Sequence, residues 1–144
     1  MTESSTTKLP TSFWVISAVA LVWNCLGAVA YLMQVTMSAE TLQAMPEAER
    51  AMYTDIPVWA TAAFAIAVWG GVLGSVLLLL RKKAATTVFV VSLAGILVQM
   101  VHAFFISANP ITGASRMVMP LLVVAIGAYL FWFSSDAGKK GWLS

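Results

Sequence analysis

The sequence contains very few charged residues. Asp, Glu, Lys and Arg make up only 10% of its 144 residues, while 60% are hydrophobic. A soluble domain has about 25% charged residues. So few polar groups cannot cover the surface of a water-soluble globule, and lipid must therefore solvate much of the chain. The net charge of +2 is small, and the cations stand at segment ends, which argues against a nucleic-acid partner.

Cysteine and histidine are almost absent, with one residue of each, Cys25 and His102. A lone cysteine excludes a disulfide framework and a cysteine-based zinc site within one chain. His102 would need further ligands to hold a metal ion, and a haem or quinone site normally uses more histidines. We therefore expect no metal and no cofactor. Nucleophilic catalysis lacks a base within reach of Cys25 or the serines, so an enzyme is not expected either.

Charge is missing altogether from four long apolar runs. A helix needs about 20 residues to cross a hydrocarbon core, and the runs predict membrane spans at residues 12–35, 57–80, 84–107 and 117–134. The chain is thus predicted to be an all-α membrane protein, a four-helix bundle forming a single domain over residues 1–144. Proton-coupled antiporters usually need a carboxylate inside the membrane, so a four-helix drug/proton antiporter is not expected.

The first run also has features of a signal peptide. Lys8 precedes it, and Ala28-Val29-Ala30 resembles a cleavage site. However, the hydrophobic run continues to Val35, and we expect it to be retained as a span. Residues 1–11 are polar and predict a tail.

The cations predict the orientation. An even number of spans places the basic segments on one side of the membrane, and the positive-inside rule makes this side the cytoplasm. The opposite side carries Glu40, Glu47, Glu49 and Asp55, with Arg50 and Arg116. Both termini are therefore predicted to be cytoplasmic. The residues that determine this topology are Arg81, Lys82, Lys83, Lys139 and Lys140, together with Lys8.

Residues 36–55 form the longest polar loop and are predicted to be partly helical. Ser38 is a suitable N-cap, and Pro46 suits the start of a second short helix that extends to Tyr53. This outer loop is either an interfacial element on the membrane surface or a solvated connector. Asn109 and Pro110 predict a turn in the loop 108–116.

Small residues recur along one face of the second span. This spacing allows another helix to approach closely, and we expect the face to pack against a helix or against a second copy of the chain. Its members are Ala63, Ala67, Gly70, Gly71, Gly74 and Ser75.

Polar residues share one face in the first span and one in the third. Our hypothesis is that the two faces meet and form one polar cluster that opens outward and binds a ligand. The alternative is that these residues only form hydrogen bonds between helices, which contribute about 0.6 kcal/mol on average. The candidate ligand-binding residues are Asn24, Tyr31, Gln34, Gln99 and His102.

The chain resembles an uncharacterised group of small four-span inner-membrane proteins of Gram-negative bacteria, often labelled automatically as sugar transporters. The resemblance covers nearly the whole chain and rests on four stretches. They are Lys8-Leu9-Pro10, the stretch from Gln34 to Arg50, the run from Ala63 to Gly71, and Lys140-Gly141-Trp142. The resemblance implies a bacterial inner-membrane location but carries no binding residue. The group's pattern is expected to have Tyr-Asn where this chain has His102-Ala103.

Two functions remain open at this stage. The first is a transporter or facilitator for an uncharged solute such as a sugar, acting as a homo-oligomer because four helices enclose little space. The alternative is an accessory protein whose outer loop, residues 36–55, binds a membrane or periplasmic protein.

Overall fold

The computed structural model describes residues 8–107, 110 and 112–144. The first seven residues of the expected tail, and Asn109 in the expected turn, lie outside the described residues. The described chain forms helices and no strand. Its long helices are α1 (Thr11–Val35), α4 (Val58–Leu79), α5 (Ala84–Val101) and α6 (Ala114–Lys139).

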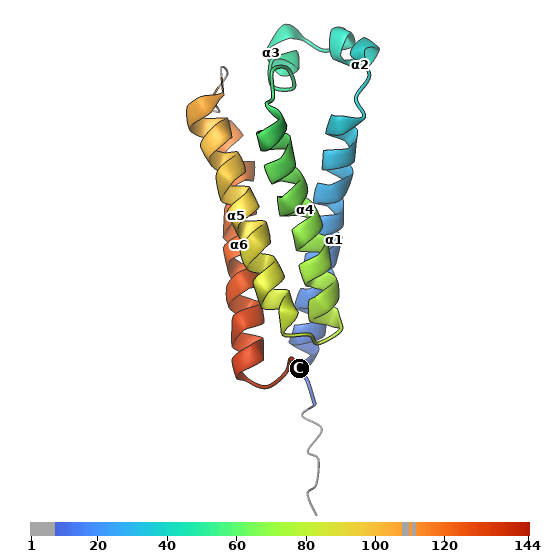
Figure 1. Ribbon diagram of the computed structural model, residues 1–144, viewed down its shortest axis with the longest axis vertical. Helices are drawn as coiled ribbons and strands as arrows, with labels where there is room; N and C mark the ends of the chain where they lie inside the picture. The colour runs from blue at the N-terminus through green and yellow to red at the C-terminus, as the bar shows by residue number, and fades with distance from the viewer. Residues whose placement is uncertain (1–7, 108–109, 111) are drawn as a thin grey trace, which may run out of the picture.

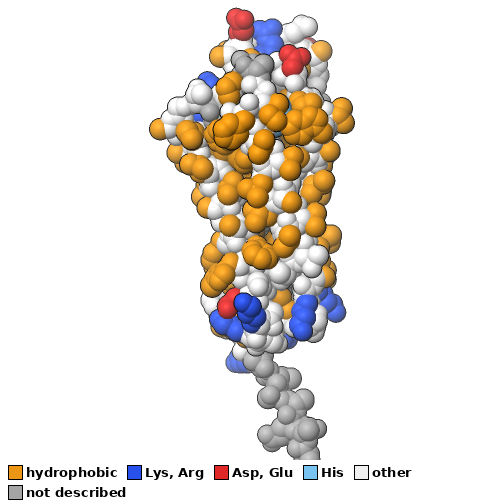
Figure 2. Space-filling model, turned by 60° about the vertical axis from the view of Figure 1, so that its left-hand side comes forward, with side chains coloured by type: hydrophobic (Ala, Val, Ile, Leu, Met, Phe, Trp, Pro, Cys, Tyr) orange, Lys and Arg blue, Asp and Glu red, His pale blue; other side chains and the backbone are white. Residues whose placement is uncertain are grey.

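Within the described residues, four helical segments are long and apolar enough to cross a membrane, namely α1, α4, α6 and the continuous run of α5 with the π-helix η1 (His102–Ile106). They lie side by side as an elongated bundle (Figure 1). Figure 2 shows a broad hydrophobic band between two charged ends. The protein is therefore an all-α, multi-pass membrane protein with a four-helix bundle, which confirms the predicted fold.

The two ends of the bundle carry opposite charge. The acidic end contains Glu40, Glu47, Glu49 and Asp55 in the loop between α1 and α4. The basic end contains the loop between α4 and α5, the end of α6 and the start of α1, and its cations are Lys8, Arg81, Lys82, Lys83, Lys139 and Lys140.

Helix α6 is longer than the sequence predicts. The predicted span covers residues 117–134, whereas α6 runs from Ala114 to Lys139. At the far end Ala137 is fully buried, and Asp136 pairs with Lys140 at 2.9 Å. Packing and an ion pair therefore extend the helix into a segment whose polar composition predicts a tail.

The outer loop contains two short helices, α2 (Ala39–Ala44) and α3 (Glu47–Arg50). The Ser38 hydroxyl accepts a hydrogen bond from the Thr41 N–H at 3.1 Å, which confirms the predicted N-cap. Helix α3 follows Pro46 as expected but ends at Arg50, and turns replace the predicted helix to Tyr53. Neither short helix contains a buried residue.

Helix α4 lies at the centre of the bundle, between α1 and α5, while α6 contacts α5. The small-residue face of α4 makes both contacts possible. Gly71 lies under the Asn24 side chain of α1, and Gly74 lies under the Phe89 ring of α5. At Gly95 of α5 the neighbour is backbone, and a Cβ atom there would stand 2.9 Å from the Ala63 carbonyl oxygen of α4.

The expectation that this face could pair two copies of the chain therefore needs correction. The chain's own helices cover it, since Ala63, Ala67, Gly71, Gly74 and Ser75 are all buried within one chain. A homo-oligomer would have to use another surface, such as the lipid-exposed sides of α1 and α6.

The last four residues fold back under the basic end. Ser144 donates its N–H to the Arg81 carbonyl oxygen at 2.8 Å, and Lys83 donates to the Ser144 oxygen at 3.1 Å. The Arg81 guanidinium donates to the Trp142 carbonyl oxygen at 2.9 Å. The Trp142 ring meets Phe13 of α1 edge-on, with 5.9 Å between centroids, and Phe13 stacks on Phe133 of α6 at 5.8 Å. This C-terminal segment thus joins the two outer helices, α1 and α6, at one end.

Candidate functional site

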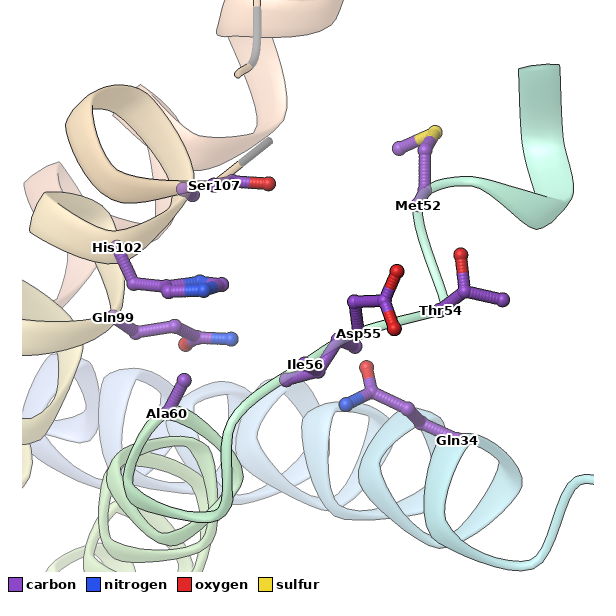
Figure 3. Close-up of a pocket in the computed structure, with 10 residues that line it drawn as sticks. Gln34, Met52, Thr54, Asp55, Ile56, Ala60, Gln99, His102 and Ser107 are labelled. Atoms are coloured by element: carbon purple, nitrogen blue, oxygen red, sulfur yellow. The ribbon is translucent and has the colours of Figure 1, made fainter. Parts of the chain in front are cut away.

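A polar pocket opens at the acidic end of the bundle, between the ends of α1, α4 and α5 (Figure 3). Its volume is about 150 Å³. We call it the outer pocket. Its lining residues are Gln34, Met52, Thr54, Asp55, Ile56, Ala60, Gln99, His102, Ala103 and Ser107.

Helix α1 and helix α5 supply the two amide side chains of the outer pocket. Gln34 lies in the last turn of α1, and Gln99 lies near the end of α5. In Figure 3 both amides extend from their helices toward the space beside Asp55. Each amide carries one hydrogen-bond acceptor oxygen and one donor NH₂ group, so the pocket offers both kinds of partner to a ligand.

His102 stands where α5 changes into the π-helix η1. Its ring meets the Trp59 ring of α4 edge-on, with centroids 5.2 Å apart and planes 87° apart. Its carbonyl oxygen accepts a hydrogen bond from the Ser107 N–H at 2.8 Å, which closes the wider turn. Short π-helical turns often mark functional sites, and this one directs the imidazole toward the pocket (Figure 3).

Asp55 is the acidic residue of the outer pocket. Its φ of 60° lies in the left-handed region, which Asp and Asn adopt more readily than other side-chain-bearing residues. Among the residues that the structure describes, no ion pair or hydrogen bond engages its carboxylate. Backbone strain of this kind often accompanies functional sites. The sequence interpretation used Asp55 only for orientation. The sequence feature that could have indicated a site is the position of Asp55 directly before a membrane span.

The structure divides the five candidate ligand residues into two groups. Gln34, Gln99 and His102 line the outer pocket together, while Asn24 and Tyr31 lie elsewhere. The expected single cluster is therefore not formed. Its members are separated because α4 stands between the polar faces of α1 and α5.

Asn24 joins α1 to α4 near the middle of the bundle. Its NH₂ group donates to the Ala20 carbonyl oxygen at 2.8 Å and to the Ser75 hydroxyl at 3.2 Å. Ser75 in turn donates to the Gly71 carbonyl oxygen at 2.7 Å. This arrangement matches the hydrogen-bonding role that the sequence left open as an alternative.

Tyr31 packs against aromatic rings of α4. Its ring meets Phe64 at 5.4 Å and Trp69 at 6.4 Å between centroids, edge-on in both cases. Such edge-to-face pairs contribute about 0.5–1.5 kcal/mol beyond the area they bury. The contacts fix how α1 lies against α4.

The Asn24 contact yields a prediction about stability. A Cβ atom at position 71 would collide with the Asn24 carboxamide oxygen, so Gly71→Ala should destabilise the bundle by about 1–3 kcal/mol. Asn24→Ala removes the obstacle, and the double variant should recover most of that loss. Unfolding titrations of the wild type, both single variants and the double variant form the cycle that tests this coupling. Additive effects of the two substitutions would contradict the contact.

A second cavity of about 440 Å³ lies deeper in the bundle and is lined by all four long helices. Most of its walls are apolar, and its polar side chains include Asn24 and Ser92. Ser92 donates to the Ala67 carbonyl oxygen at 2.6 Å. Because both groups are already hydrogen-bonded, this groove suits hydrocarbon better than a polar ligand.

The described residues contain no group of three or more His, Cys, Asp and Glu side chains that could hold a metal ion. Of the described residues that line the outer pocket, only Asp55 and His102 are of these types. The pocket can therefore donate and accept hydrogen bonds and attract positive charge.

Comparison with known proteins gives no match among family models, curated proteins or solved structures. The functional argument therefore rests on the geometry of the outer pocket.

Proposed function

We propose that this membrane protein binds a small hydrogen-bonding solute in the outer pocket, as the first step of its transport or facilitated passage across the bacterial inner membrane. The convergence of Gln34, Asp55, Gln99 and His102 on one pocket supports this proposal. Pockets for drug-sized ligands measure about 300–1,000 Å³, so a pocket of about 150 Å³ suits a smaller solute.

Passage beyond the pocket requires a movement of the helices or an assembly of several chains. On the membrane side of the pocket, Gly95 lies against the backbone of Ala63 and Ala67, so α4 and α5 leave little space between them. The orientation with the acidic end outside follows from the positive-inside rule. In that orientation the solute enters from the periplasmic side.

An accessory role through the outer loop is the second candidate. The observation that favours it is the exposure of α2 and α3, which bury no residue, together with the partly exposed Met52 and Tyr53 beside them. A partner protein could cover this surface. In that case the outer pocket would have no need of water access.

Cysteine labelling tests the first proposal. In a Cys25→Ser background, single cysteines at positions 34, 99 and 102 should react rapidly with a charged maleimide added from outside. A cysteine at position 24 should react slowly, because Asn24 lies deep between α1 and α4. An exposed control cysteine at position 43 in α2 reports on access to the loop.

The opposite outcome is equally informative. If position 43 reacts while positions 34, 99 and 102 do not, the outer pocket is dry and solute binding is excluded. The accessory role would then be favoured, and cross-linking from the outer loop would be the next experiment.

A further inference from the structure

We infer that the outer pocket selects small primary ammonium compounds over neutral sugars. This inference rests on the proposed function, since it names the solute class of the same pocket. It departs from the uncharged solute that the sequence suggests, because the structure adds Asp55 to the site.

The charge of the outer pocket is the first argument. Among the described residues that line it, Asp55 is the only acid, and none is Lys or Arg. The described residues supply no ion-pair partner to the Asp55 carboxylate. A positively charged ligand would therefore form an ion pair with the Asp55 carboxylate without displacing a described side chain of the pocket.

The surrounding surface has the same sign. The acidic end carries four carboxylates, Glu40, Glu47, Glu49 and Asp55, against the two cations Arg50 and Arg116. A surface with an excess of one sign raises the local concentration of ligands of the opposite sign. The route into the pocket thus favours cations.

Hydrogen-bonding geometry narrows the class further. A primary ammonium group carries three N–H donors. Three separate elements supply three possible acceptors to the pocket, namely the Asp55 carboxylate and the amide groups of Gln34 and Gln99. In Figure 3 the Gln99 amide turns its nitrogen toward this space. Either amide presents its oxygen after a half-turn of its terminal bond. A quaternary ammonium ion has no N–H group and would leave these acceptors unused.

The remaining walls set the size of the ligand. The apolar part of the lining consists of Met52, Ile56, Ala60 and Ala103. Together with the volume of about 150 Å³, these side chains suit a short carbon chain attached to the ammonium group. A divalent metal is a poorer match, because the described residues offer no cluster of three strong ligands.

Isothermal titration calorimetry on the full chain in lipid nanodiscs tests the inference, with ethylammonium, tetramethylammonium and glucose as probes. Ethylammonium should bind most tightly. Asp55→Asn should weaken its binding by about tenfold or more, as expected for loss of a charged hydrogen-bond acceptor. Asn also tolerates the left-handed backbone of position 55, so the loop should keep its shape. Glu49→Gln, an exposed acid outside the pocket, is the matched control and should change binding less than about twofold.

The outcomes separate the inference from the proposed function. If glucose binds more tightly than ethylammonium and Asp55→Asn leaves its binding unchanged, the inference is wrong and the proposed solute site stands. If tetramethylammonium binds as tightly as ethylammonium, the three-acceptor argument is wrong. If no probe binds to a protein that remains folded by circular dichroism, both the inference and the proposed function fail.

Discussion

Gly95→Leu should be among the most damaging single substitutions in this protein. At Gly95 the backbones of α4 and α5 nearly touch, since a Cβ atom would stand 2.9 Å from the Ala63 carbonyl oxygen and 3.0 Å from the Ala67 nitrogen. Backbone atoms cannot rotate aside as a side-chain end can. Even Gly95→Ala should cost about 1–3 kcal/mol of unfolding free energy, and the leucine variant should prevent stable packing of α5 on α4.

Gly138→Ala in α6 is the matched control. Apart from its chain neighbours and the backbone of its own helical turn, no described atom lies within 4 Å of the Cβ that this substitution adds. Alanine is the better helix former by about 1 kcal/mol, so this variant should be as stable as the wild type or slightly more so. Detergent-induced unfolding followed by circular dichroism measures both variants. Equal stability of Gly95→Leu and the wild type would show that α4 and α5 do not approach as closely as described.

The same substitution should also disturb the outer pocket. Gln99 lies four residues beyond Gly95 on α5, and Ala60 lies three residues before Ala63 on α4. Both residues line the pocket. Any separation of α4 from α5 therefore widens the pocket, and ligand binding should weaken even where the protein still folds.

The membrane spans were predictable because their signal is local. A run without charge that is long enough to cross the bilayer has few alternatives to a helix. The same reasoning failed at the end of α6, where Ala137 and Asp136 appeared to belong to a polar tail. The buried environment of Ala137 comes from distant parts of the chain, which composition does not reveal.

The position of the polar residues was only half predictable. Helical spacing correctly placed Asn24, Tyr31 and Gln34 on one face of α1, and that face meets α4 or the outer pocket. The spacing could not show which helix would lie opposite. The glycines of α4 admit both α1 and α5, and α4 therefore separates the two polar faces except at the acidic end.

Asp55 illustrates a different limit. From sequence it is one of several acids in a polar loop, and its charge predicts only orientation. Its role in the pocket depends on a backbone φ of 60° and on the course of the loop over the ends of the helices. Neither property is encoded in a periodic pattern. The residue that changes the expected ligand class is thus one that only the structure could identify.

The basic end should open when Trp142 is removed. The Trp142 ring meets the Phe13 ring of α1 and lies under the Lys140 ammonium at 4.8 Å, and both contacts are lost in alanine. Next to it, Leu143 is only 3% exposed. Trp142→Ala should lower the free energy of unfolding by about 3 kcal/mol. This value is the lower end of the range for buried tryptophans, because Trp142 is only partly buried.

Trp132→Ala provides the control for loss of a tryptophan. Trp132 is 58% exposed on the outside of α6, so it faces lipid and its removal should leave the bundle closed. Spin labels on cysteines at positions 11 and 139, in a Cys25→Ser background, report the separation of α1 and α6. Trp142→Ala should lengthen and broaden their distance distribution, whereas Trp132→Ala should not.

This experiment also bears on transport. Under the proposed transport function, a pocket open at the acidic end and a bundle held closed at the basic end correspond to an outward-open state, in which the C-terminal segment is the inner barrier. Opening that barrier should then let a charged maleimide added from the side of the basic end reach a cysteine at position 17, which is fully buried in the wild type. If the distance distributions of the two tryptophan variants coincide, Trp142 does not hold α1 and α6 together. The direct contact between Phe13 and Phe133 would then be the contact that closes the basic end.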